Sequence, residues 1–202
     1  MKQRLHAALD DRPVAQILAR HLLHAHFQPI VKLVSGEVFA HEGLIRGPEG
    51  SSLRAPDALF RAARQDGLAI ALEKECLATC LAAWPLQGST QRLFLNLSGH
   101  SLLHWWDQLG AQGLVAALGP VAQLAPSLVI EITEHEHVAD VPKLVLAADA
   151  LRALGLQFAL DDFGDGRSSL RQWAELRPEI PLSQNSCRLH CKADEPQRRA
   201  TL

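Results

Sequence analysis

Residues 158–170 read FALDDFGDGRSSL, and they place two adjacent carboxylates, Asp161 and Asp162, directly after a short apolar run. Gly164 and Gly166 follow within a few positions. An apolar run of this length bounded by turn residues is typical of a buried strand. The stretch therefore predicts a strand that ends in two acids, whose charges must share a small space.

Upstream of this stretch, apolar strands alternate with amphipathic helices. The strand-like segments are 26–31, 37–45, 92–98, 127–133 and 156–164, and the helical patterns cover 56–66, 69–84, 102–118 and 141–154. Pro56 and Asp57 mark a helix start and Gly67 marks its end. This alternation predicts an α/β fold with a parallel sheet covered by helices, either open or closed into a barrel.

Polar residues at the strand ends favour the barrel. Each lies at or near the downstream end of a different strand: Glu42, Asn96, Glu131 and the pair Asp161 and Asp162. A (β/α) barrel collects its functional groups at the carboxyl ends of several strands, whereas an open sheet collects them at one switch point.

Carboxylates gathered on one face need a countercharge, because like charges about 4 Å apart repel by about 4 kcal/mol at intermediate dielectric. The donors are hard oxygens, which suit Mg²⁺ or Mn²⁺ better than zinc. Adjacent aspartates could flank two ions for phosphodiester hydrolysis. Any one acid could instead be a helix cap or a solvated loop residue, but recurrence at five positions favours a metal site.

Five motifs in order, FQPIV, HEGLIRG, LFLNLS, LVIEITE and FALDDFGDGRSSL, resemble those of the EAL domain. This family comprises bacterial phosphodiesterases that open cyclic di-GMP to a linear dinucleotide. The resemblance runs from about Phe27 to about Ile180. It implies a two-metal site of Mg²⁺ or Mn²⁺ with the ligands Glu42, Asn96, Glu131, Asp161 and Asp162.

The same resemblance implies further roles. Arg46 would contact the substrate phosphate or base, and Gln28 would line the substrate pocket. Glu134 would support the loop after the paired aspartates. Gly43 stands where the family usually has alanine, and we expect this change between small residues to be tolerated.

The resemblance ends where a sixth strand with the catalytic lysine should follow. The only lysine after Asp162 is Lys192, and Pro181 interrupts the place of that strand. We therefore expect an incomplete TIM-like (β/α) barrel of about five to six of eight units. Its expected parts are an N-terminal helical segment (1–26), a partial EAL domain (27–180) and an aberrant, disordered tail (181–202).

Three functions remain open. The first is an EAL-type cyclic di-GMP phosphodiesterase that is inactive or nearly so, because the catalytic lysine and the later acidic motifs are absent. The alternative is a non-catalytic cyclic di-GMP-binding or protein-interaction module. The third is a damaged gene product whose reading frame changed near Ile180. Open barrel edges would invite a homodimer or a partner protein.

Composition limits the partners. The formal net charge is −2, which gives no broad attraction to DNA or to an anionic membrane. No apolar stretch approaches the ~20 residues of a membrane span. Without a signal peptide, the cysteines fit the reducing cytoplasm, and Cys76 and Cys80 fit a helical core stripe. The histidines are expected at the surface, namely His21, His24, His26, His135 and His137.

Overall fold

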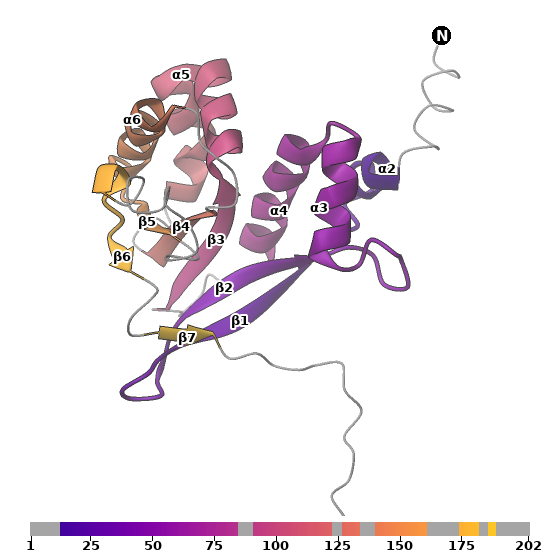
Figure 1. Ribbon diagram of the computed structural model, residues 1–202, viewed down its shortest axis with the longest axis horizontal. Helices are drawn as coiled ribbons and strands as arrows, with labels where there is room; N and C mark the ends of the chain where they lie inside the picture. Colours follow the sequence, from indigo (N-terminus) through magenta and orange to yellow (C-terminus); the bar gives the residue numbers. More distant parts are fainter. Residues whose placement is uncertain are drawn as a thin grey trace, which may run out of the picture.

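The computed structural model describes residues 13–84, 91–122, 127–133, 140–160, 174–181 and 186–188 of the chain. These residues form an α/β fold around one seven-stranded sheet with the order β6-β5-β4-β3-β2-β1-β7 (Figure 1). The strands are β1 (His24–Lys32), β2 (Val38–Arg46), β3 (Arg92–Ser98), β4 (Leu128–Thr133), β5 (Gln157–Leu160), β6 (Ile180–Pro181) and β7 (Ser186–Arg188). The predicted fold class is confirmed.

The sheet is parallel from β2 to β6 and antiparallel at its other end, where β1 pairs with β2 and β7 pairs with β1. Residues 33–37 join β1 to β2, which is too short for a crossover of a dozen or more residues. Gly36 takes a φ of +71° in this turn. The predicted parallel arrangement is thus correct from β2 onward, and the first strand forms a hairpin instead.

Helices cover one face of the sheet. They are α2 (Pro13–Ala19), α3 (Pro56–Gln65), α4 (Ala69–Ala83), α5 (Gly99–Ala122) and α6 (Val141–Arg152). Figure 1 shows α3 and α4 beside β1 and β2, and α5 and α6 beside β3 to β5. Pro56 opens α3, and Gly67 follows α3 with a φ of +68°, as predicted. None of the helices in the described ranges is long and apolar enough to cross a bilayer.

A side chain at the end of β3 caps the start of α5. The Oγ of Ser98 accepts a hydrogen bond from the backbone N–H of Ser101 at 3.1 Å. An N-cap side chain accepts from an N–H two or three residues further on, so Ser98, the last residue of β3, acts as the cap. The strand therefore passes directly into the helix.

Both faces of the sheet carry clusters of buried apolar side chains. Leu93, Leu95 and Leu97 of β3 pack with the helices. The face away from the helices, here called the inner face, carries a second cluster whose members are fully buried: Ile30, Ala40, Phe94, Val129 and Ala159. Side chains alternate along a strand, so residues two positions after members of this cluster also belong to the inner face. Glu42, Asn96 and Glu131 meet this condition.

The two edges of the sheet are tied by a short connection. Four residues separate Pro181 of β6 from Ser186 of β7, and this length of chain reaches at most about 18 Å. In a flat sheet of seven strands, the two edges would lie about 29 Å apart. The sheet must therefore curve until its two edges come close to each other, and the inner face is its concave side.

The C-terminal tail contributes a strand to this sheet. β7 pairs with β1 through Ile30, Val31 and Lys32, although residues 181–202 were expected to be irregular. Pro181 was expected to interrupt a sixth strand, but it belongs to β6 and pairs with Leu160 of β5, because proline is tolerated on an edge strand. Residues 189–202 lie outside the described ranges, and the division at 26 and 180 stays a prediction.

Candidate functional site

Three of the predicted metal ligands meet on the inner face of neighbouring strands. Glu42 lies on β2, Asn96 on β3 and Glu131 on β4. Asn96 and Glu131 are direct partners in the parallel register, and Glu42 pairs with Phe94, two positions before Asn96. The structure therefore places these three residues on one face of three adjacent strands.

A hydrogen bond fixes the orientation of Asn96. Its Nδ2 donates to Oε1 of Glu42 at 2.8 Å. The carbonyl oxygen Oδ1 is consequently the atom of Asn96 that can ligate a cation, because only the nitrogen faces the carboxylate. Asn96 is half-buried, whereas Glu42 is only 5% exposed and Glu131 is fully buried.

The two predicted substrate-contacting residues lie on the adjacent hairpin. Gln28 of β1 is the direct antiparallel partner of Glu42. Arg46 is the last residue of β2 and follows Glu42 by four positions, so the two share a face of the strand. The Nη1 of Arg46 donates to the carbonyl of Ile45 at 2.9 Å.

Three further predicted site residues lie outside the described ranges. β5 ends at Leu160, so Asp161 and Asp162 are the next two residues of the sequence. Glu134 follows the last residue of β4. Within the described ranges, no three His, Cys, Asp or Glu side chains form a group that could hold a metal ion. Glu42 and Glu131 with the amide of Asn96 make up the described part of the candidate centre.

The chemistry of these donors fits a hard divalent cation. Two buried carboxylates and an amide oxygen are ligands that Mg²⁺ and Mn²⁺ accept, and no thiolate or imidazole is among them. Ionised carboxylates on β2 and β4, the two strands that flank β3, would create a negative potential that a divalent cation would balance. The described residues are therefore suited to one part of a metal shell.

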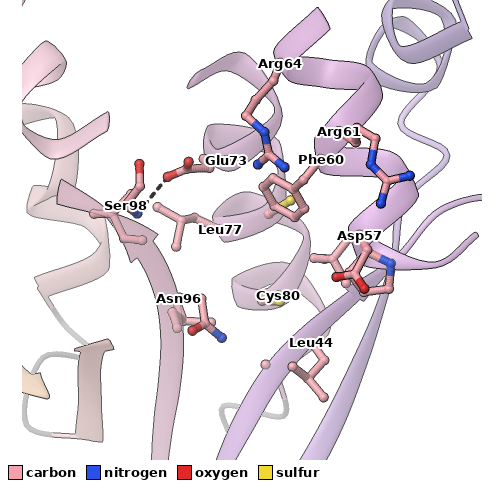
Figure 2. A pocket seen from close by; sticks show the side chains of 16 residues that line it. Leu44, Asp57, Phe60, Arg61, Arg64, Glu73, Leu77, Cys80, Asn96 and Ser98 are labelled. Carbon is pink, nitrogen blue, oxygen red and sulfur yellow. Dashed lines mark hydrogen bonds between the residues drawn. The ribbon is translucent and has the colours of Figure 1, made fainter. Parts of the chain in front are cut away.

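A pocket of about 720 Å³ lies beside this centre, and the sequence did not predict it (Figure 2). Pairing between β2 and β3 stops at Gly43 and Leu95, and the strands diverge beyond that point. Asn96 and Ser98 line one wall of the pocket, and α3 and α4 line the other.

Charged side chains of the two helices surround the pocket. Arg61 and Arg64 of α3 lie at its rim, and Glu73 of α4 accepts a hydrogen bond from the backbone N–H of Ser98 at 2.9 Å (Figure 2). In the sequence, the only indication of this pocket was the spacing of Arg61 and Arg64, which places both side chains on one side of a helix. Divergence of strands is a tertiary property that leaves no local pattern.

The cysteines and histidines that are described match their predicted roles. Cys76 and Cys80 are buried and free. Burial raises the pKa of Cys80 to about 12, and burial together with Cys80 and nearby glutamates raises the pKa of Cys76 further. His24 and His26 are exposed, and His21 contacts Glu75 at 2.6 Å with its ring 77% exposed. His135 and His137 lie outside the described ranges.

Curated relatives share this region of sequence. The chain is 30% identical over 171 residues to the cyclic di-GMP phosphodiesterase NbdA of Pseudomonas aeruginosa, covering 79% of this chain and 21% of the relative. It is 28% identical over 181 residues to the probable cyclic di-GMP phosphodiesterase PdeB of Escherichia coli, covering 88% of this chain and 33% of that protein. The chain thus spans less than two fifths of these relatives.

Solved structures share the fold. The chain is 31% identical to Klebsiella pneumoniae BlrP1, solved as a calcium/cy-diGMP complex, with a TM-score of 0.63 over 79% of this chain and 39% of that one. The Bacillus subtilis YkuI protein with an EAL domain matches with a TM-score of 0.65 at 21% identity, over 83% of this chain and 43% of that one. These similarities confirm a partial TIM-like (β/α) barrel.

A family model also covers most of the sequence. Residues 11–180 match the EAL domain, and the matched segment includes every predicted site residue from Gln28 to Asp162. The match therefore extends over far more than half of the chain. On this basis the chain belongs to the EAL domain family.

Proposed function

We propose that this chain carries the metal- and substrate-binding part of a cyclic di-GMP phosphodiesterase domain. The observation that supports this proposal most is the contact between Asn96 and Glu42 beside the buried carboxylate of Glu131. Oxygen donors on three successive parallel strands are the arrangement that a barrel enzyme needs to hold a cation at the carboxyl ends of its strands. The names of the curated relatives support the substrate.

Asp161 and Asp162 complete the proposed ligand set, and the cation is Mg²⁺ or Mn²⁺. Relatives solved with calcium or manganese and the cyclic dinucleotide support a divalent ion. When bound, such ions supply a Lewis acid and lower the pKa of a ligated water. The chain's own contribution is to hold the donors in place, because Asn96 fixes the Glu42 carboxylate and neighbouring strands fix Asn96 and Glu131.

The hairpin would bind the substrate. The guanidinium of Arg46 offers paired donors that match a phosphate, and β2 directs it to the same face as Glu42. Gln28, opposite Glu42, would contact the dinucleotide from β1. Glu134 would support the loop after the paired aspartates.

We further propose that the 202-residue chain hydrolyses the dinucleotide far more slowly than its relatives. The resemblance implies a catalytic lysine on a sixth strand, and the only lysine after Asp162 is Lys192. Without that group, the attacking water loses a partner that orients and activates it. Binding of metal and dinucleotide requires only the residues named above, so binding should persist.

One experiment tests metal binding, substrate binding and turnover together. Purified chain is incubated with cyclic di-GMP and Mn²⁺ or Mg²⁺, linear product is followed by chromatography, and dinucleotide binding is measured by calorimetry on the same sample. We expect metal-dependent binding with little product. Glu131→Gln and Asp161→Asn should each abolish the metal dependence, whereas Glu37→Gln, on a 70% exposed hairpin carboxylate, should not.

Two results would contradict the proposal. Turnover at the rate of an intact phosphodiesterase would show that the missing lysine is dispensable. Absence of both metal and dinucleotide binding in folded protein would reject the proposed function itself. Folding is checked by circular dichroism on each variant, so loss of structure is not mistaken for loss of the site.

A further inference from the structure

Gly43 occupies the position directly after Glu42 on β2 and faces the opposite side of the strand. Glu42 lies on the inner face, so position 43 faces α4 and the main core. Gly43 is buried. Its φ lies outside the left-handed region, so the backbone here would accept an L-residue, and the surrounding space decides which residues fit.

The space at this position is closed. A Cβ added to Gly43 would lie 2.8 Å from Cδ2 of Leu95 and 3.0 Å from Sγ of Cys80. Contacts under 3.0 Å force a neighbour to move, and those just above are still crowded. Sequence alone suggested that glycine and alanine would be interchangeable here. The contacts with Leu95 and Cys80 indicate that they are not.

Cys80 is the less adaptable neighbour. It lies on α4, is 2% exposed, and packs against the strand through a side chain with a single rotatable bond (Figure 2). The Cβ of Cys80 would lie 3.4 Å from the added atom, which is ordinary contact, so the sulfur causes the crowding on this side. Leu95 is the cross-strand partner of Gly43, and the atom nearest to the added Cβ is the end of its flexible side chain, which can shift more easily than the sulfur.

We propose that Gly43 and Cys80 are a matched pair and that Cys80 is a positioning residue for Glu42. The sulfur fills the space that a methyl group at position 43 would need, which sets the approach of α4 to β2. Because Glu42 is the residue before Gly43 on that strand, the position of its carboxylate depends on how closely α4 approaches β2. The effect on metal binding rests on the proposed function; the packing contact does not.

A set of variants tests the pair. They are Gly43→Ala, Cys80→Ala, the double variant with both changes, and a matched double variant that combines Gly43→Ala with Cys76→Ala. Cys76 lies one turn earlier on α4, is also buried, and is not among the atoms nearest to Gly43. Each protein is measured for its melting temperature and for its Mn²⁺ affinity by electron paramagnetic resonance.

Gly43→Ala should lower the melting temperature by roughly 2 to 10 °C, the range expected for overpacking in a chain of this size. It should also weaken Mn²⁺ binding by about tenfold, as for other changes that disturb the support of a ligand. Adding Cys80→Ala should restore both quantities, whereas adding Cys76→Ala should restore neither. If Gly43→Ala does not fold, the double variant with Cys80→Ala must still fold.

Other results overturn the inference. Equal recovery with Cys76→Ala and Cys80→Ala would reject the matched pair, as would a Gly43→Ala protein that behaves like wild type. A lower melting temperature with unchanged Mn²⁺ affinity would reject the positioning role alone. If wild-type chain binds no Mn²⁺, the proposed function and the positioning role both fail, and the melting temperatures still decide the packing contact.

Discussion

Arg152 and Glu179 form a contact of 2.6 Å between Nε and Oε1 that joins α6 to the segment before β6. The other carboxylate oxygen of Glu179 accepts a hydrogen bond from the backbone N–H of Phe158 in β5 at 2.8 Å. The guanidinium of Arg152 also lies over the ring of Phe158, 5.1 Å from its centroid. One carboxylate thus connects a helix, a strand and the approach to the last parallel strand.

The first prediction concerns pH. Burial opposes ionisation of Glu179, but the hydrogen bonds from Arg152 and the Phe158 amide outweigh it and lower the pKa below its ordinary value of 4.5. A lowered folded-state pKa contributes stability above pH 4.5 that is lost as the pH falls through the lowered value. Glu179→Gln should therefore cost about 1 to 2 kcal/mol at pH 7 and less at pH 3, measured by urea unfolding.

Glu37→Gln is the matched control, because Glu37 is an exposed carboxylate on the hairpin. Its unfolding free energy should follow that of wild type at both pH values. A loss for Glu179→Gln that stays the same from pH 7 to pH 3 would show that its charge is not what stabilises the contact.

The second prediction concerns Asn96. Asn96→Leu removes the donor to Glu42 and the oxygen available to a cation, while roughly keeping the side-chain size. We expect Mn²⁺ affinity to fall at least about tenfold. The unfolding free energy should fall by about 1 to 3 kcal/mol, because the partner carboxylate loses a hydrogen bond in a buried site. Isothermal titration and urea unfolding measure the two quantities.

Gln65→Leu, on an exposed position of α3, is the control for adding an apolar side chain. Unchanged metal affinity in Asn96→Leu would remove Asn96 from the proposed ligand set. It would not affect the contribution of its hydrogen bond to stability.

The third prediction concerns the edge of β1. A chain that stops after Pro181 lacks β7 and leaves the backbone of Ile30, Val31 and Lys32 without this partner strand. Exposed strand edges pair with other chains. We expect this shortened chain to self-associate in analytical ultracentrifugation at concentrations where the full chain does not. A chain that stops after Arg188 keeps β7 and should behave like the full chain; equal self-association of both shortened chains would contradict a protective role for β7.

The fourth prediction concerns the thiols of α4. Only thiolate reacts readily with iodoacetamide, and burial raises the pKa of Cys80 to about 12. At pH 8 in native protein, Cys76 and Cys80 should label far more slowly than in 6 M urea. Peptide mass spectrometry locates the label at each position. Rapid native labelling at either position would show that α4 opens from the sheet.

Much of the fold was predictable because its signals are local. Pro56 and Gly67 delimit α3 by their backbone restrictions, and the alternation in RLFLNLS places Asn96 on the face opposite Leu95. Parallel register then brings Asn96 beside Glu131 without any further information. The positions of the three described ligands, Glu42, Asn96 and Glu131, follow from the alternation of side chains along each strand and from the order of the strands.

The features that were not predicted depend on tertiary structure. β7 is three residues long in a polar stretch, too short to show a period. The closed space at Gly43 depends on Cys80, 37 positions later, and on how closely a helix approaches a strand. Ser98 and Ser101 are both plausible caps in sequence, and only the end point of β3 decides between them.

The pairing of β7 with β1 also has a consequence for the order of events during synthesis. Ile30 and Arg188 are partners although 158 positions separate them in the chain. Contacts of such long sequence separation form late and slow the overall folding rate. The first hairpin is therefore complete long before its outer partner leaves the ribosome, and the outer edge of β1 stays open until β7 has been made.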